Sequence, residues 1–537
     1  MKITIGQDII EIQQPVTLEN IARTYFPDKK IYAAIINGKL CELNYQINDD
    51  VLIEWIEANS MTGKQIYERT LTFLFIVATK QIFPEAFIRV EFAFQDGLYC
   101  TIKKKNSLTL QDTIKIKQRM VELVQAKCVI SRHQLAKDKA ISFFEQNHLE
   151  DKADLLRYRQ KETCSIYQME GIYNYFYGFM LPNTAYLKHI SLQFFEPGVR
   201  LGQKDVTFRY FKLFQVMKEY EEWGELMGVQ TVAKLNEKIV HGQIKELMLM
   251  SEAMIEKKLA ELATQIAHQK DHVRMILVAG PSSAGKTTFS KRLCIHLRIL
   301  GMKPITISMD DFYLNREDTP RLPDGSFDFE NIEAVDLKLF NKTMLQLINH
   351  EAVCLPRYNF KTGQRSFDRQ PTFLNDDHIL IIEGIHGLNP RTSFYIPEDA
   401  KIKIYINALT HLNYDNHNHI PTSDYRLIRR IVRDYQFRNS KAKETIRRWK
   451  NVKAGEDQYI YPYQEEADFI FNTSMVYELA VLKPIAKKLL SQIRLDEKEY
   501  IQANRLNKLL DYIVSAQVDI PQVSILAEFV GNSIFEQ

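Results

Sequence analysis

The sequence has little that would place it in a membrane or an oxidising compartment. No stretch offers 18 consecutive uncharged apolar residues. The opening residues, MKITIGQDIIEI, alternate apolar and polar side chains and contain no basic segment followed by an apolar one. The six cysteines show neither a CxxC pair nor disulfide-like spacing: Cys41, Cys100, Cys128, Cys164, Cys294 and Cys354. We therefore expect a cytoplasmic protein without membrane contact, with reduced thiols that mostly fill its core.

A strong excess of one charge is also missing. Lys and Arg number 70 against 67 Asp and Glu, which gives a formal charge of +3 and argues against a protein coated over its whole surface by nucleic acid. Any site for a polyanion must therefore be local. Hydrophobic residues make up 45% of the 537 positions, enough for several cores, and at roughly 150 residues per domain the length predicts three or four domains.

Changes of pattern predict the domain boundaries. Residues 1–58 combine short alternating strands at 2–5, 9–12, 32–36 and 51–55 with a helix at 18–25, and Asn37-Gly38 is a hairpin signal, which indicates a β-grasp module. Residues 59–215 mix a helix near 67–82 with a hairpin at 87–101, as expected of an α+β domain. Residues 216–270 carry an apolar helical face and form a helical connector.

The pattern changes again after Asp271. Short apolar runs at 275–279, 379–382 and 402–406 alternate with helical segments, which predicts a parallel sheet covered by helices over residues 271–485. Residues 486–537 are expected to form a C-terminal helical segment. The predicted fold class is α/β, with a parallel-sheet domain preceded by the β-grasp module and the α+β domain.

One motif carries clear chemistry. The run 275–279 leads into Gly280-Pro-Ser-Ser-Ala-Gly-Lys-Thr287 and a helical stretch, which is GxxxxGK[ST] in its strand–loop–helix context. Its glycines let consecutive N–H groups face a phosphate, Lys286 reaches the β and γ phosphates, and Thr287 supplies a hydroxyl to Mg²⁺. The predicted nucleotide contacts are Gly280, Ser282, Ser283, Ala284, Gly285, Lys286, Thr287 and Thr288.

Two carboxylates follow further predicted strands. Asp310 ends the segment 304–309, at the sheet edge where ligands of open α/β folds bind, and can accept a proton from an alcohol that attacks a phosphoryl group. Glu383 follows four aliphatic residues, the position from which a Walker B acid holds Mg²⁺. The alternatives are a helix N-cap for Asp310 and an ordinary surface residue for Glu383.

A basic segment spans residues 424–450. Arg426, Arg429, Arg430 and Arg433 share one face of a predicted helix, where like charges repel unless an anion neutralises them. Such a helix suits a lid that closes over a triphosphate and stabilises charge on the transferred group. A solvated or RNA-binding basic face is the alternative.

Five separated segments resemble a known family. GPSSAGKTT, DDFY, PRYNF, IIEGI and RLIRRIVRD look like the uridine kinase and phosphoribulokinase branch of P-loop kinases. The resemblance implies ATP or GTP as donor, Mg²⁺, and a nucleoside or similar sugar hydroxyl as acceptor. It implies Lys286, Asp310, Arg429 and Arg433 as catalytic residues and Thr287 and Glu383 at the metal. The implied acceptor-site residues are Asp310, Tyr313, Glu333, Tyr358, Phe360, Arg426 and Arg438.

The sequence departs from this family at two places. Gly363 stands where a base-contacting histidine is expected, and the "RGR" after the lid reads Arg438-Asn439-Ser440. Both departures weaken the inference to a pyrimidine nucleoside, because recognition of a base depends on polar groups placed against its edge. Glu333, in place of an aspartate, also lengthens the ribose-binding arm by one methylene.

The N-terminal half resembles other proteins. Residues 1–58 look like a TGS domain, and the following domain is similar to the editing-type second domain of threonyl-tRNA synthetase. Arg69 and Phe73 occupy the two histidine positions of its HxxxH motif, and Phe176 occupies the cysteine position. Without these ligands a metal site of that type cannot form. We therefore expect a binding or regulatory role, with RNA or a regulatory ligand as partner.

The leading interpretation is a nucleoside kinase that uses ATP or GTP and Mg²⁺. One alternative keeps the reaction and changes the acceptor to another sugar, sugar phosphate or small alcohol. The other is an RNA- or ribosome-associated regulatory NTPase, in which the P-loop acts as a switch. An oligomeric assembly is compatible with all three.

Overall fold

The computed structural model describes residues 2–5, 8–12 and 14–535. Its first unit is a five-stranded sheet of order β2-β1-β7-β4-β5 that packs on one helix. Helix α1 (Leu18–Tyr25) begins where Thr17 accepts a hydrogen bond from the N–H of Asn20, and it buries Leu18 and Ile21 against the sheet. The strands are β1 (Lys2–Ile5), β2 (Asp8–Glu11), β4 (Ile31–Ile36), β5 (Lys39–Glu42) and β7 (Val51–Glu57), with the short pair β3 (Val16–Thr17) and β6 (Gln46–Ile47) beside them.

The second unit is built around a long buried helix. Helix α2 (Met61–Ile82) lies against an antiparallel sheet of order β13-β14-β9-β8 and against α3 (Leu110–Gln125). A second sheet of order β10-β11-β12 carries α4 (Lys137–Gln146) and α5 (Glu150–Arg157). The strands are β8 (Phe87–Ala93), β9 (Gly97–Lys103), β10 (Ser131–Ala136), β11 (Thr163–Met169), β12 (Ile172–Asn174), β13 (Ser191–Phe195) and β14 (Gly198–Gly202).

Three helices follow, α6 (Phe211–Leu226), α7 (Val232–Val240) and α8 (Ile244–Ala267). The apolar face expected on the last of these is confirmed. It buries Leu247, Ile255, Leu259, Leu262 and Ile266.

The C-terminal half is a parallel sheet of order β16-β19-β15-β20-β23. Its strands are β15 (Met275–Ala279), β16 (Lys303–Ser308), β19 (His378–Gly384), β20 (Lys401–Asn407) and β23 (Phe469–Asn472). The three apolar runs expected to be buried strands are therefore confirmed. The accompanying helices are α9 (Lys286–Ile299), α10 (Leu337–Ile348), α11 (Thr422–Arg438), α12 (Ala442–Tyr459), α13 (Glu478–Leu490), α14 (Tyr500–Leu510) and α15 (Ala527–Val530), and a small hairpin pairs β17 (Arg357–Asn359) with β18 (Gln364–Ser366).

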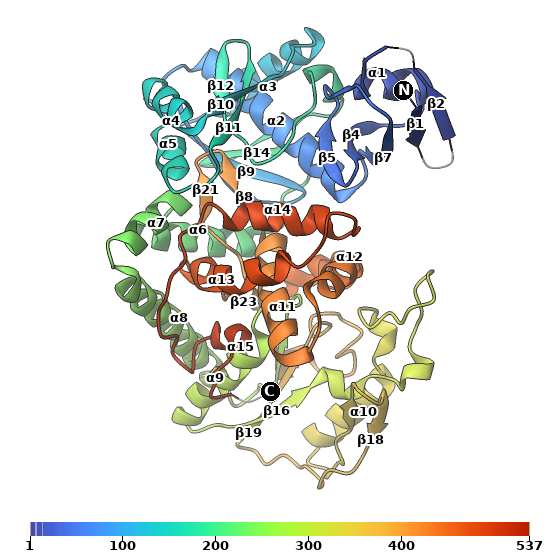
Figure 1. Ribbon diagram of the computed structural model, residues 1–537. Coiled ribbons are helices and arrows are strands. Elements are labelled where there is room, and N and C mark those ends of the chain that lie inside the picture. The colour runs from blue at the N-terminus through green and yellow to red at the C-terminus, as the bar shows by residue number, and fades with distance from the viewer. Residues whose placement is uncertain (1, 6–7, 13, 536–537) are drawn as a thin grey trace.

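A second hairpin joins the two halves. Strands β21 (Asn413–Asp415) and β22 (Asn418–His419) lie between β20 and α11 in sequence, and Figure 1 shows β21 reaching up to the strands of the N-terminal half. There the Lys152 ammonium lies 3.2 Å from the Asp415 carboxylate, and both side chains are fully buried. Asn413 donates to the carbonyl oxygens of Val90 and Glu91. The sequence patterns did not predict this hairpin.

One hydrophobic core runs through both halves, because it contains buried residues of α4, α5, the parallel sheet, α11, α13 and α14. Figure 1 shows α14 directly beneath the N-terminal half, between it and the parallel sheet. Within the described residues, no helix is both long and apolar enough to cross a membrane.

Candidate active site

The loop after β15 curls tightly against the neighbouring strand. A Cβ on Gly280 would overlap the carbonyl oxygen of Ile406, so only glycine fits there. Ser283 and Gly285 both have positive φ, at 61° and 85°. These conformations turn the loop around a concave backbone surface that ends at α9, whose first residue is Lys286. The local geometry is that of a phosphate-binding loop at a helix N-terminus.

Lys286 lies over this loop. Its Nζ donates to the carbonyl oxygens of Gly280, at 3.0 Å, and Pro281, at 3.2 Å. Burial lowers the pKa of the Lys286 ammonium, and the carboxylates of Glu383 and Asp310 oppose that shift. The structure thus brings together the lysine and both carboxylates that the sequence singled out.

Glu383 ends β19, next to the first turn of α9. Thr287 donates its hydroxyl to one Glu383 carboxylate oxygen at 3.3 Å, while the other oxygen, Oε2, is buried without a hydrogen-bond partner. Burial raises the pKa of Glu383 to about 7, against the effect of the Lys286 charge. A hydroxyl beside a carboxylate with an unsatisfied oxygen is a donor set that suits Mg²⁺, so Thr287 and Glu383 fit the predicted metal site.

Two neighbouring aspartates follow β16 and do different things. Asp310 faces the Lys286 charge, and burial raises the pKa of its carboxyl. Asp311 instead accepts from the backbone N–H of Tyr358 at 3.1 Å and from Arg369 at 3.0 Å. Asp311 therefore holds the β17–β18 hairpin in place, and Asp310 remains the group open to a substrate hydroxyl.

Three aromatic rings gather beside Asp310. The centroids of Tyr358 and Phe360 lie 5.0 Å apart, and Tyr313 lies 5.8 Å from Tyr358 and 6.1 Å from Phe360, all edge to face. Tyr313 and Tyr358 are buried, whereas Phe360 is 56% exposed. This cluster contains the three aromatic residues expected in the acceptor site.

The glutamate that acts on this cluster is not the one we expected, because it is Glu330 whose charge, after burial and the charge of Asp310, raises the pKa of Tyr313. Glu333 is more than half exposed and pairs with Arg391 at 2.6 Å on the surface. Glu330 instead is half-buried, and its pKa is raised to about 7 by burial, with the charges of Arg430 and Lys286 opposing and that of Asp310 adding. Glu333 therefore lies on the surface in this structure, and Glu330, three residues earlier, is the glutamate that faces the charges of Lys286 and Arg430. Either glutamate satisfies the sequence pattern, because spacing alone does not show which faces inward.

The arginines of α11 also differ from the expectation of a lid whose charges need an external anion. Arg426 forms a two-point ion pair with Glu456, with both side chains fully buried, and donates to the Ser282 carbonyl at 2.9 Å. Arg429 pairs in the same way with Glu478 and donates to the Ser283 carbonyl at 3.3 Å. These two arginines are neutralised by carboxylates of the protein and hold the loop backbone. They are positioning residues in this structure.

The remaining arginines of α11 make different contacts. Arg430 donates to the hydroxyl of Ser282 at 2.7 Å. Arg433 bonds Asp434 at 3.1 Å, and its pKa is lowered, first by burial and then by the Arg438 charge. Arg438 ends α11 and is 58% exposed. Its charge lowers the pKa of the Asp310 carboxyl, against the larger effect of burial. The contact of Arg433 and Arg438 with a phosphoryl group stays a prediction.

One site residue has no signal in the sequence. Glu528, on the short α15 near the C-terminus, accepts from the backbone N–H and the hydroxyl of Thr288. Ile525 of the same segment lies against Gly285, where a Cβ would collide with it. Ala284, buried beneath, accepts a hydrogen bond from Thr473 at 2.6 Å. The contact between Glu528 and Thr288 joins residues 240 positions apart, which no local pattern reveals.

In the N-terminal half, the three positions aligned with metal ligands lie close together, but their side chains are not metal ligands. The rings of Phe73 and Phe176 pack 5.5 Å apart, both buried. Arg69 donates to the Phe179 carbonyl at 3.1 Å. Aromatic packing and a guanidinium thus stand where the family's ligands are expected.

A P-loop at the carboxyl edge of a parallel sheet, with two carboxylates facing its lysine, defines a P-loop phosphotransferase domain. Residues 275–480 match the Phosphoribulokinase / Uridine kinase family. The C-terminal half therefore contains a domain that matches this kinase family.

The N-terminal part is similar to threonine–tRNA ligases. It is 27% identical to the ligase of Alkalilimnicola ehrlichii over 186 residues, which cover 34% of this chain and 29% of the ligase. The chain thus spans less than a third of the curated relatives it matches. Among solved structures, the C-terminal half is similar to a possible uridine kinase of Bacillus stearothermophilus at 20% identity, with a TM-score of 0.28 over 40% of this chain and 98% of the other. A candidate fructose transport system kinase of Silicibacter is 18% identical, with a TM-score of 0.29, and the match covers 40% of this chain and 98% of the other.

Proposed function

We propose that the C-terminal domain transfers the γ-phosphoryl group of ATP or GTP to the 5′-hydroxyl of a nucleoside. The observation that carries the proposal is the cluster of Lys286, Asp310 and Glu383 at the mouth of the P-loop. One cation and two carboxylates meet there at the sheet edge. Phosphoryl transfer needs little more than such positioning and charge stabilisation.

Each residue of the cluster has a role that its surroundings support. Lys286 would bind the terminal phosphates, and Arg433 and Arg438 would stabilise charge on the transferred group. Mg²⁺ held by Thr287 and Glu383 would supply charge neutralisation between the phosphates. Asp310, half-buried and beside the aromatic cluster, would orient the acceptor hydroxyl and accept its proton.

The aromatic cluster and Glu330 support a ring-bearing acceptor with sugar hydroxyls. Tyr313, Tyr358 and Phe360 offer edges and faces to a flat base, and Glu330 can bond two neighbouring hydroxyls. Gly363, at φ +75°, packs against Arg316 where a histidine would contact a pyrimidine. This difference favours a second candidate, in which the acceptor is another sugar or small alcohol.

A direct assay separates these candidates. Full-length protein is incubated with Mg²⁺, ATP or GTP, and a panel of nucleosides, free sugars and sugar phosphates, and phosphorylated products are quantified. Formation of a nucleoside 5′-monophosphate that stops in Lys286→Ala supports the proposal. Products from sugars alone would move the assignment to the second candidate, and nucleotide hydrolysis without any phosphorylated acceptor would contradict both.

A further inference from the structure

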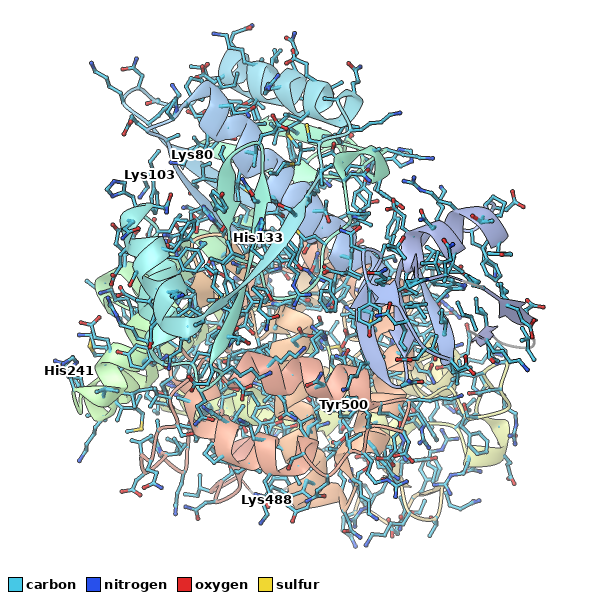
Figure 2. The ribbon with its side chains drawn as sticks, turned by 45° about the horizontal axis from the view of Figure 1, so that its top comes forward. Lys80, Lys103, His133, His241, Lys488 and Tyr500 are labelled. Carbon is cyan, nitrogen blue, oxygen red and sulfur yellow. The ribbon has the colours of Figure 1, made fainter. Side chains whose placement is uncertain are left out.

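A cavity of about 570 Å³ lies between the two halves, away from the P-loop. It is lined by α2, β10 and β11, the loop at 175–179, the β21–β22 hairpin, the start of α11 and one face of α14. Tyr500, labelled at the beginning of α14 in Figure 2, is one of its lining residues. Nothing in the proposed kinase reaction uses this cavity.

Cations predominate in the lining. The acids are Glu68, Asp424 and Asp511, while the cations are Lys39, Arg69, Arg132, Arg159, Lys161, Arg505 and Lys508. Two of the acids are already neutralised, since Asp424 pairs with Arg505 and Asp511 with Lys487. Among the described residues, no carboxylate lies within ion-pair distance of Lys39, Arg69, Arg159, Lys161 or Lys508.

The unpaired cations face one another. The pKa of Lys508 is lowered, first by burial and then by the charges of Lys161, Arg159 and Arg132. Burial also lowers the pKa of Arg69 to about 10. Mutually repelling cations in a partly desolvated space are stabilised when an anion binds between them, and guanidinium groups suit phosphate oxygens in particular.

Aromatic rings also line the cavity, beside these charges. Tyr177 stacks on Tyr414 with centroids 4.1 Å apart, and Tyr175 meets Tyr177 edge to face at 5.0 Å. The Arg159 guanidinium lies 5.5 Å from the centre of the Tyr512 ring. The cavity therefore offers both a flat apolar surface and a group of cations.

We propose that this cavity binds a nucleotide, its phosphate between Arg159, Lys161 and Lys508 and its base against the tyrosines. The volume is within the range of pockets that enclose small molecules, and phosphate and aromatic ring match the two kinds of lining. A folded RNA would instead need an extended basic track, whereas these cations converge into one space. The proposal does not depend on which acceptor the kinase domain uses.

The cavity is physically connected to the P-loop. Arg505 of α14 lines it and forms a two-point ion pair with Asp424 in the first turn of α11. The same helix carries Arg426 and Arg429, which bind the carbonyl oxygens of Ser282 and Ser283. A ligand that moves α14 would therefore act on the helix that holds the P-loop, which suits a regulatory site.

The test is calorimetric titration of the full-length protein with AMP, GMP, CMP and UMP at low and high salt. Lys161→Ala and Lys508→Ala probe the cavity; both lysines are exposed, so these variants keep the fold. Lys103→Ala, an exposed lysine at the end of β9 shown in Figure 2, is the matched control. Glu330→Gln reports on binding of a product at the kinase site.

We expect at least one monophosphate to bind, with the dissociation constant raised about tenfold in each cavity variant and unchanged in Lys103→Ala, whereas a binding step weakened only by Glu330→Gln belongs to the kinase site. Absence of binding by all four monophosphates overturns the proposal, as does binding that the cavity variants leave intact. Cavity-dependent binding of a tRNA or of oligouridylate, without binding of any monophosphate, would overturn it too and assign the cavity to RNA. A kinase assay on the same samples shows separately whether the proposed function holds.

Discussion

The carboxylate of Glu528 accepts hydrogen bonds from both the backbone N–H, at 3.2 Å, and the hydroxyl, at 2.8 Å, of Thr288. Thr288 is the third residue of α9, so this carboxylate satisfies part of the helix N-terminus that follows the P-loop. Anions favour such a position because of the free N–H groups and the helix dipole. A carboxylate of the C-terminal segment thus lies at the helix N-terminus where a nucleotide phosphate is expected to bind.

Replacing Glu528 should strengthen nucleotide binding. Glu528→Gln keeps an oxygen for Thr288 but removes a negative charge beside the phosphates, so we expect the dissociation constant for ATP to fall about three- to tenfold. Glu225→Gln is the control for loss of one negative charge, because Glu225 is an exposed residue of α6. Fluorescence titration with a labelled ATP analogue measures the effect, and equal or weaker binding in Glu528→Gln would show that the contact supports the loop.

Asp310→Asn tests the proton acceptor. The variant keeps the size of the side chain and removes the base, so kcat should fall by about 10²- to 10⁴-fold while ATP binding is retained. Asp318→Asn, in an exposed turn, should leave kcat within about twofold of the wild type. Steady-state kinetics with the accepted substrate give the comparison, and a kcat for Asp310→Asn near that of the control rules out the assigned role.

Glu330 and Glu333 form a matched pair for the acceptor site. Glu330→Gln should raise the KM of the acceptor about tenfold or more, with little change in the KM of ATP, because the half-buried carboxylate is proposed to bind the acceptor hydroxyls. Glu333→Gln should behave as wild type, since Glu333 is paired on the surface. The reverse result would return the assignment to Glu333.

The pH dependence of stability follows from Glu383, whose pKa is raised to about 7. Its folded form binds a proton more tightly than the unfolded chain, so its contribution is fully present below pH 4.5 and is lost as pH rises through 7. The loss should reach a few kcal/mol, since one pKa unit is worth about 1.4 kcal/mol. Urea unfolding at pH 6 and 8 should show a smaller decrease for Glu383→Gln than for the wild type. An identical decrease would mean that Glu383 keeps an ordinary pKa.

Arg426 and Arg438 distinguish a buried arginine from an exposed one on the same helix. Arg426→Met leaves Glu456 buried without its partner and should lower the free energy of unfolding by about 3–5 kcal/mol. Arg438→Met should change it by no more than about 0.5 kcal/mol, because Arg438 is largely exposed. Chemical denaturation measures both. Similar stabilities would contradict the structural role given to Arg426.

Local patterns predicted the elements of this fold well and its long-range contacts poorly. Helix 18–25, the buried strands and the P-loop follow from periodicity and from glycine spacing, which act between near neighbours. The choice between Glu330 and Glu333 depends on which way a short turn faces. The carboxylate partners of Arg426 and Arg429 lie 30 and 49 residues away. The local sequence therefore shows only a row of like charges, which predicts an anion-binding surface.

The same limit explains the missed hairpin. Residues 413–419 are mostly polar and carry no strand periodicity. Their hydrogen-bond partners lie in the other half of the chain, so no local pattern predicts the hairpin. Glu528 belongs to the same class, because its partner Thr288 comes from the opposite end of the kinase domain. Tertiary partners decide these positions, and one sequence does not reveal them.

The burial of Lys152 against Asp415 bears on how this protein can be divided. Severing the chain after α6 would break the buried ion pair between the halves, leaving Lys152 with Asp151 in one fragment and Asp415 with Asn418 in the other. Each fragment would also expose apolar surface of the core that the halves share, so we expect both to be less stable than the same segments in the intact chain.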